Sequence, residues 1–216
     1  MKPLKTGEII PGIFAVSNGQ VNFYLVRAGQ GHIAIDAGAS ERSALAGLSA
    51  LKINPGDVTA VFLTHTDGDH VGGIGVFHQA QAYISKQEEQ MIDGSAKRAV
   101  FMGRNKLACP YATLNDGESV DPGGVSVKCM VTPGHTKGSA CYIIDGRYLF
   151  SGDSFSLKGG KAAPFVTLLN MDGAEQKKSI VKIAGLHGID AAFTGHHGYT
   201  EDFAGAFADW RGQDSK

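Results

Sequence analysis

Hydrophobic positions along the chain fall in short runs with the length and composition of β-strands. Nine such runs are rich in β-branched and aromatic residues and are bounded by glycine, proline or polar residues. They cover residues 12–17, 21–28, 32–36, 58–64, 82–85, 125–132, 140–145, 147–151 and 191–195. The run VSVKCMV (residues 125–131) places four apolar side chains on one face, as a half-buried strand does. Asp145-Gly146, between two apolar runs, predicts a hairpin turn.

Apolar residues with helical spacing occur in four stretches: residues 40–51, 86–93, 174–186 and 202–210. The first carries Leu45, Leu48 and Leu51 on the face that we expect to be buried. Asp172 precedes the third stretch and is suited to cap it. The strand runs form two groups, each followed by helical stretches. This order predicts an α/β fold in which two packed sheets are covered by helices, a four-layer αββα sandwich.

The bulk composition narrows the class of protein. A chain of 216 residues that is 43% hydrophobic can bury a substantial core, and we expect one domain over residues 1–216. Twenty basic and 21 acidic residues give a net charge of -1, which argues against a nucleic-acid-binding surface. The sequence shows neither a signal-peptide core nor an apolar window of the ~20 residues that span a bilayer. Three cysteines without a CxxC pair are typical of a reducing compartment, so we expect a cytoplasmic protein that binds no membrane.

Metal-ligating side chains are concentrated in the stretch THTDGDHVGG, residues 64–73. Four of them fall within six positions: His65, Asp67, Asp69 and His70. Gly68 allows the tight turn that would point these neighbours into one cavity. Imidazole and carboxylate ligands together suit zinc, iron or manganese better than calcium or magnesium. We therefore predict a metal site in the loop that follows the run at residues 58–64.

Three later stretches repeat this arrangement, in which an apolar run ends and a glycine and then a histidine or aspartate follow. They are TPGHTKGS with His135, YLFSGDS with Asp153 and AAFTGHHG with His196. Alone, Asp153 would most often be a turn or capping residue, His135 a loop histidine, and HTDGDH an aspartate-rich turn. Four such coincidences in one chain favour a shared metal site over separate structural roles. His196 is preferred to its neighbour His197 because it directly follows a glycine.

The order of these motifs resembles that of the metallo-β-lactamase-fold superfamily. HxxxDHxGG, PGHTxGS, SGD and a late TGH follow one another as in that family, and VNFYLVRAGQGHIAIDAG is similar to its opening strands. The resemblance covers most of the chain and implies an αββα sandwich with one or two metals at its upper edge. It also implies two ligand sets, joined by Asp153 as a bridge: His65, the residue at 67 and His135 in the first, and Asp69, His70 and His196 in the second.

Asp67 departs from the family motif, which usually has histidine at this position. A carboxylate is a harder ligand than imidazole and adds negative charge, so it favours iron or manganese over zinc relative to an all-histidine site. Flavodiiron proteins, which have this fold, are similar in carrying a carboxylate here. A competing interpretation is that Asp67 is too short to reach the first metal, which leaves that position weak or empty. We expect two divalent metal ions, zinc or iron, with manganese as a further option.

The predicted function is that of a metal-dependent hydrolase. Two metals bridged by Asp153 and a water would lower the pKa of that water and yield hydroxide for attack on an ester, thioester, lactone or phosphoester. Asp69 would orient the hydroxide or accept a proton as the catalytic residue. One alternative is a di-iron redox enzyme related to flavodiiron proteins, which reduces oxygen or nitric oxide or oxidises a thiol. A metal-binding relative without activity is less favoured, because every ligand position is filled.

The substrate is expected to be a small molecule that is held by segments without clear periodicity. Residues 86–118 mix a helix with a long polar loop, and residues 156–165 form a second loop. The basic residues of the first segment could meet an anionic substrate, although such side chains are more often solvated: Lys97, Arg98, Arg104 and Lys106. Phe207 and Trp210 are expected to be core residues rather than substrate contacts.

Overall fold

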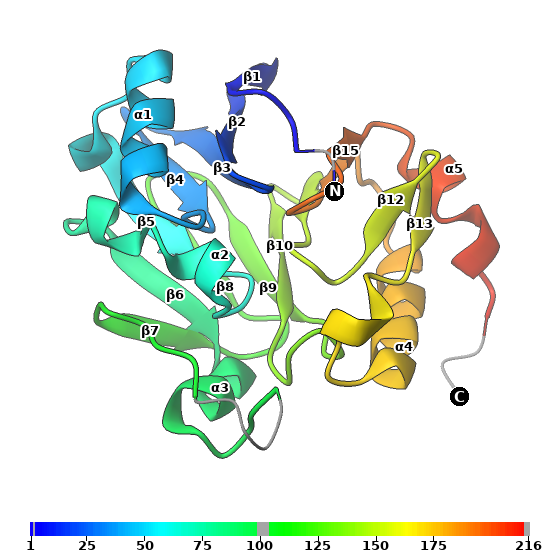
Figure 1. Cartoon of the computed structure of the whole chain (residues 1–216). Helices are drawn as coiled ribbons and strands as arrows, with labels where there is room; N and C mark the ends of the chain where they lie inside the picture. The colour runs from blue at the N-terminus through cyan, green and yellow to red at the C-terminus, as the bar shows by residue number, and fades with distance from the viewer. Residues whose placement is uncertain (2, 99–103, 214–216) are drawn as a thin grey trace.

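A computed structural model describes residues 1, 3–98 and 104–213, and within them the strands form two main sheets (Figure 1). The first sheet follows the chain order: β1 (Gly7–Ile10), β2 (Ile13–Asn18), β3 (Val21–Ala28), β4 (Gly31–Ile35), β5 (Val58–Phe62), β6 (Gln81–Ser85) and β7 (Tyr111–Leu114). The second has the order β15-β14-β11-β10-β9-β8: β8 (Ser119–Val120), β9 (Val127–Val131), β10 (Ala140–Ile144), β11 (Tyr148–Phe150), β14 (Ala191–Phe193) and β15 (Tyr199–Thr200). A separate hairpin pairs β12 (Ser156–Lys158) with β13 (Lys161–Ala163).

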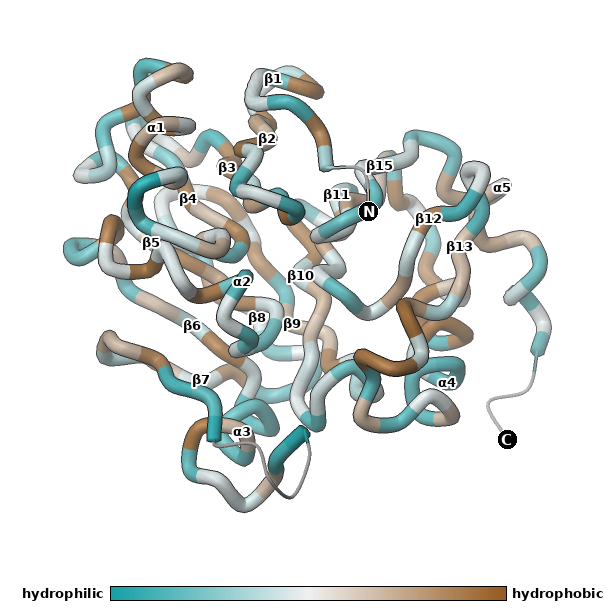
Figure 2. Tube along the Cα trace, in the orientation of Figure 1, coloured by the Kyte–Doolittle hydropathy of each residue, from teal (hydrophilic) through white to brown (hydrophobic). Residues whose placement is uncertain are grey.

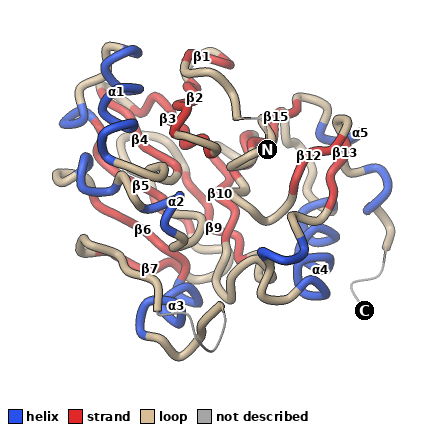
Figure 3. The backbone as a smooth tube through the Cα atoms, in the orientation of Figure 1, coloured by secondary structure: helices blue, strands red, loops and turns tan. Residues whose placement is uncertain are grey.

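Helices cover the outer faces of both sheets, so the predicted four-layer αββα sandwich is confirmed (Figure 3). The α-helices are α1 (Glu41–Leu51), α2 (Gly68–Val71) and α3 (Glu89–Asp93) on the first sheet's side, and α4 (Gly173–Ala184) and α5 (Phe203–Ala206) on the second's. Short 3-10 turns are η1 (Pro55–Asp57), η2 (Ile74–Phe77), η3 (Lys86–Glu88), η4 (Thr167–Leu169) and η5 (Ala208–Trp210). Over the described part of the chain, no helix combines the length and apolar character that a membrane span requires.

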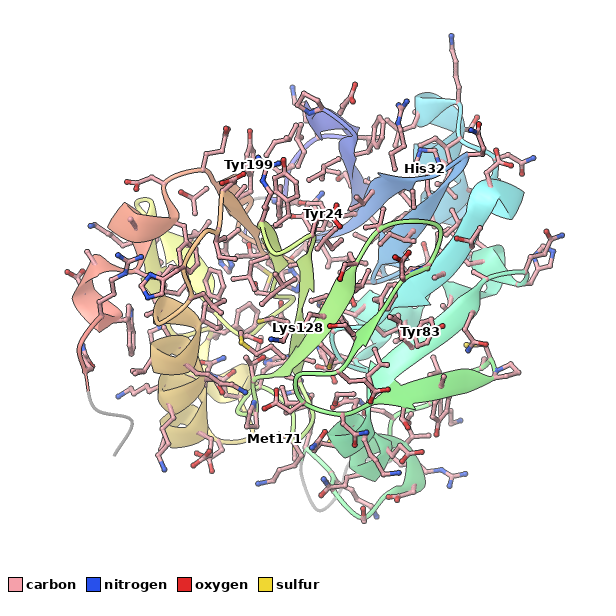
Figure 4. The ribbon with its side chains drawn as sticks, turned by 180° about the vertical axis from the view of Figure 1, so that it is seen from behind. Tyr24, His32, Tyr83, Lys128, Met171 and Tyr199 are labelled. Atoms are coloured by element: carbon pink, nitrogen blue, oxygen red, sulfur yellow. The ribbon has the colours of Figure 1, made fainter. Side chains whose placement is uncertain are left out.

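Three buried apolar clusters fill the three spaces between these four layers. The cluster between the sheets includes Tyr24, Phe150 and Phe193, whose rings pack edge-on or stacked at centroid distances of 4.5 to 5.4 Å. The Tyr24 hydroxyl donates a hydrogen bond to the Thr194 carbonyl at 2.7 Å, so β3 is tied to the end of β14. Viewed from behind, Tyr24 lies near the middle of the molecule, where the two groups of strands meet (Figure 4).

Each of the nine predicted strand runs contains a strand, and three predicted helical stretches form helices. The Asp145-Gly146 turn is confirmed, because both residues have positive φ (50° and 68°) and Arg147 N donates to Ile144 O at 2.9 Å. Asp172 caps α4 by accepting from two backbone N–H groups at 3.0 Å. Six strands were not predicted from the sequence: β1, β7, β8, β12, β13 and β15.

Two details of the helical prediction were wrong. Leu45 is 48% exposed, because the buried face of α1 is formed instead by Ala44, Gly47 and Leu48. Stretch 202–210 is not one helix, since α5 ends at Ala206 and a 3-10 turn follows. Its apolar residues are nevertheless buried in the cluster beneath α4, as expected: Phe207 fully and Trp210 in part.

The strand directions bring distant loops to one edge of the sandwich. Strands β9 and β11 both pair antiparallel with β10, and β14 pairs parallel with β11, so these three strands end at the same edge. The end of β5 joins them there, because Ala140 N donates to Thr64 O at 2.9 Å and the Tyr142 hydroxyl donates to Leu63 O at 3.1 Å. The loops after β5, β9, β11 and β14 therefore meet.

Candidate metal centre

The four loops bring all seven predicted ligand side chains together. Their donor atoms form three overlapping groups, each within 4.8 Å: His65, His70 and Asp153; His65, Asp67 and His135; and Asp69, His70 and His196. The second and third groups correspond to the two ligand sets that the family resemblance implies. His197, which was set aside in favour of its neighbour, belongs to none of these groups.

Asp153 lies between the two ligand sets and is 4% exposed. Its Oδ2 lies 3.4 Å from the Nε2 atoms of both His135 and His196, and its Oδ1 lies 3.7 Å from His70 Nε2. This central place is the one that a bridging carboxylate requires. Asp69 differs, because 46% of its side chain is exposed while its Oδ2 lies 3.3 Å from His196 Nε2. Asp69 is therefore the ligand-type carboxylate that is open to an incoming molecule.

Each histidine turns Nε2 toward the centre because its Nδ1 is bonded elsewhere. The Nδ1 partners are Asp36 for His70 (2.8 Å), the Gln20 carbonyl for His196 (2.7 Å), Asn170 for His135 (3.2 Å) and Thr64 for His65 (3.1 Å). Such outer contacts fix the tautomer and orientation of a ligating imidazole. Asp36 was not predicted to be a site residue, although it also follows an apolar strand and precedes a glycine-containing turn. Its positive φ of 62° is uncommon for a residue other than glycine.

Two buried side-chain atoms that could ligate a metal have no hydrogen-bond partner among the described residues. They are His65 Nε2 and Asp153 Oδ1. Buried polar atoms are nearly always satisfied in folded proteins, so this pair indicates that a further group belongs between them. Gly195 leaves the space for it, because a Cβ there would lie 2.8 Å from His70 Cε1 and 2.9 Å from Asp153 Oδ1. This donor set of imidazoles and carboxylates fits a divalent metal such as zinc.

The charges at the centre are strongly coupled. Burial opposes ionisation of His196, yet its hydrogen bonds to Asp153 and Asp69 raise its pKa to about 9. Burial also opposes ionisation of Asp69, but the His196 hydrogen bond and the charges of His70 and His65 lower its pKa to about 2. Protonated His196 therefore pairs with the carboxylates of Asp153 and Asp69. A bound cation would take the place of that proton.

Asp67 is also engaged by side chains from the segment 86–118, of which residues 99–103 lie outside the described residues. Arg98 forms an ion pair with Asp67, donating from Nε to Oδ1 at 3.1 Å and from Nη2 to Oδ2. Asn105 Nδ2 donates to the same Oδ1 at 3.1 Å. Oδ2 remains 3.3 Å from His135 Nε2 and 3.5 Å from His65 Nε2. The Asp67 carboxylate thus lies close to His65 and His135 of the first ligand set and is also paired with the Arg98 guanidinium.

Among the basic side chains of segment 86–118, Arg98 behaves differently from the others. Lys97, Arg104 and Lys106 are exposed, as expected of solvated charges. Arg98 is only 17% exposed in its side chain and lines the pocket at the centre. The pattern of charges along the sequence did not distinguish Arg98 from its neighbours.

Glu88, from the same segment, holds two of the ligand-bearing loops together. It is 1% exposed and accepts hydrogen bonds from the Thr66 backbone (2.8 Å) and hydroxyl (2.7 Å) in the loop after β5. Its other oxygen accepts from the Thr136 hydroxyl (2.6 Å) and from Gly138 N (3.2 Å) in the loop after β9. Burial raises the pKa of Glu88, against these hydrogen bonds and the charge of His65. This role depends on the fold and left no local signal in the sequence.

A pocket of about 440 Å³ opens onto the centre. Its walls include Asp69, Asp153 and Arg98, together with apolar side chains of the loop that precedes α4. The volume lies within the range of ~300–1,000 Å³ that is usual for small-molecule sites. An αββα sandwich with metal-ligand side chains at one edge, beside a pocket of small-molecule size, is typical of a metal-dependent α/β protein that acts on small molecules.

Comparison with known proteins identifies the family. The model of the metallo-β-lactamase superfamily matches residues 16–208. Because this match covers most of the chain, the protein belongs to that superfamily, as the sequence motifs implied.

Relatives of known description are matched over part of their length. A probable polyketide biosynthesis zinc-dependent hydrolase, BaeB of Bacillus velezensis, is 31% identical over 48% of this chain and 41% of its own. A hydroxyacylglutathione hydrolase of Brucella anthropi is 30% identical over 72% of this chain and 54% of its own. A solved B3 metallo-β-lactamase with an active-site glutamic acid has a TM-score of 0.74 at 21% identity, over 97% of this chain and 86% of its own. This last similarity supports the fold.

Proposed function

We propose that the chain is a metal-dependent hydrolase of small molecules with an ester, thioester, lactone or phosphoester bond. The observation that carries the proposal is the pair of unpartnered buried donor atoms, His65 Nε2 and Asp153 Oδ1, at the centre of seven ligand-type side chains. The open pocket beside them supplies room for a substrate. The relatives described as hydrolases support the same class of reaction.

The ligand sets would hold two divalent ions. His65, Asp67 and His135 would hold one, Asp69, His70 and His196 the other, and Asp153 would contact both. When bound, such ions lower the pKa of a coordinated water and polarise the substrate carbonyl or phosphoryl oxygen. Zinc is favoured over iron by the name of the zinc-dependent relative, and the same comparisons lend no support to the di-iron redox alternative.

Asp69 would orient the attacking water and carry its proton. Its side chain is exposed to the pocket, and an aspartate is ordinarily ionised at neutral pH, so it would accept a hydrogen bond from the water. During hydrolysis the water oxygen bonds to the acyl carbon, or to phosphorus in a phosphoester, and the bond from that atom to the leaving oxygen or sulfur breaks. The water proton passes through Asp69 to the leaving group. Imidazoles fixed by their outer partners keep the geometry constant during this step.

The proposal is tested with zinc-loaded protein against a panel of one aryl ester, one thioester, one lactone and one phosphodiester. We expect hydrolysis of at least one substrate, loss of the activity with a chelator and its return with zinc. Asp69→Asn should lower kcat by about 10²- to 10⁴-fold, whereas Asp209→Asn, at an exposed position, should leave it unchanged. Zinc-loaded protein that hydrolyses none of the panel would contradict the proposal.

A further inference from the structure

The loop of residues 165–171, called here the rim loop, exposes aliphatic side chains beside the metal centre. Leu168 is 95% exposed, Leu169 44% and Val166 43%. They are three of the five large hydrophobic residues that are exposed within the described part of the chain. Leu168 and Leu169 line the same pocket as Asp69 and Asp153. The segment appears as a brown stretch ahead of α4 (Figure 2).

The rim loop is fixed to the centre at its far end. Asn170 Oδ1 accepts from His135 Nδ1 at 3.2 Å, and Met171 N donates to His135 O at 3.1 Å. Asn170 Nδ2 donates to Gln176 Oε1 at 2.7 Å, and Gln176, which is fully buried, donates to the Asp153 carbonyl at 3.1 Å. These contacts hold the leucines at the pocket mouth before any ligand arrives. A preformed apolar surface loses little conformational entropy on binding.

Phe165 extends this apolar surface to the ligand side chains. It is 2% exposed, and its ring centroid lies 5.1 Å from that of His135 and 5.6 Å from that of His196. Phe165 lines the same pocket as Leu168 and Leu169, so apolar side chains border this pocket both beside the imidazoles and at the rim loop. A ligand that fits it has its reactive group at the inner end and an apolar arm pointing outward.

We propose that the substrates carry an unbranched aliphatic acyl chain, which lies along Phe165, Leu168 and Leu169 with its carbonyl carbon at the metal centre. This inference rests on the proposed hydrolase function and names its substrate class. Hydrolysis would release the aliphatic carboxylate, with the water oxygen on the acyl carbon, and the protonated alcohol or thiol. A protein partner fits less well, because three exposed side chains cover far less than the ~800 Å² that each partner of a stable complex buries.

The test is the dependence of kcat/KM on acyl length for p-nitrophenyl acetate, butyrate, hexanoate and octanoate. Each buried methylene should raise kcat/KM by up to about 4-fold, so hexanoate should exceed acetate by at least about 10-fold in the wild type. The double variant Leu168→Ser/Leu169→Ser should lose this gain with chain length. Leu45→Ser, an exposed leucine on α1, is the matched control and should retain the gain. A flat series in the wild type, or a gain that survives in the double variant, overturns the inference.

Binding of the carboxylate products separates this inference from the hydrolase proposal. Acetate, butyrate, hexanoate and octanoate are titrated into zinc-loaded wild type and the double variant by calorimetry. Affinity that rises with chain length only in the wild type supports the apolar arm even if no ester is hydrolysed. Affinity that is independent of length overturns it even if hydrolysis is observed.

Discussion

Asp67 occupies a position at which the superfamily motif usually has histidine, and the structure shows that its carboxylate serves two partners. Both oxygens accept hydrogen bonds from Arg98, while Oδ2 also faces His65 and His135. A cation bound by the first ligand set therefore has to share Asp67 with a guanidinium. Since like charges repel, we expect the first set to bind metal more weakly than the set formed by Asp69, His70 and His196.

Removal of the guanidinium should strengthen the weaker metal position. In Arg98→Ala we expect the second equivalent of zinc to bind about 10- to 100-fold more tightly, because a charge-assisted hydrogen bond worth ~1.5–3 kcal/mol no longer competes for Asp67. Calorimetric titration of metal-free protein measures this affinity directly. Arg104→Ala, an exposed arginine of the same segment, should behave like the wild type. Weaker binding of the second zinc in Arg98→Ala would show that Arg98 positions Asp67 instead of competing for it.

Glu88 provides a second prediction at the scale of single residues. Each of its oxygens accepts from a backbone N–H group, Thr66 N on one side and Gly138 N on the other. In Glu88→Gln the amide NH₂ must face one of these donors in either orientation, which should lower the free energy of unfolding by about 1–3 kcal/mol. Urea denaturation measures the loss. Glu89→Gln, at the neighbouring and partly exposed position, should change it little, and equal stability of the two variants would contradict the role given to Glu88.

The ligand-type residues were predictable from sequence because each follows an apolar strand and a glycine or lies in one dense motif. The residues that orient them were not, since their roles arise from contacts between distant segments. Asp36 meets His70 across 34 positions, and Arg98 meets Asp67 across 31. Nothing in the local pattern around Glu88 separates it from the solvated charges of the same segment.

At the scale of elements, most strands were predictable because their side chains are buried on both faces and form continuous apolar runs. The strands that were missed are short or carry exposed residues, such as β8 and β13. Their existence depends on pairing with a neighbour, which no local pattern encodes. The break between α5 and η5 has a similar origin, because stretch 202–210 satisfies its apolar contacts without a continuous helix.

The N-terminus of α4 links an ordinary helix cap to the site. Asp172 accepts from Ala174 N and Glu175 N, and the same first turn carries Gln176, which holds the rim loop. Asp172→Ala should lower the free energy of unfolding by about 1 kcal/mol. Asp172→Asn should retain most of that stability, because asparagine caps helices equally well. Thermal or urea unfolding distinguishes the two variants, and equal losses in both would argue against the capping role.

At the scale of the whole molecule, the site exists because two sheets pack face to face with several strand ends at one edge. The hydrogen bond between Tyr24 and Thr194 joins residues 170 positions apart and links the two sheets just before the loop that carries His196. Strand direction and sheet order, which decide where each loop ends, were not predictable from local patterns. The family resemblance implied only the αββα arrangement, which the observed topology confirms.

The proposed metal chemistry is tested most directly by a reconstitution titration. Untagged protein is stripped with a chelator, zinc is added back in steps, and bound metal and hydrolysis of the best substrate are measured on the same samples. We predict that bound zinc saturates near two equivalents per chain and that activity rises with it, with the second equivalent bound more weakly. Protein that binds no more than trace zinc, or hydrolysis that does not depend on bound metal, would contradict the proposal.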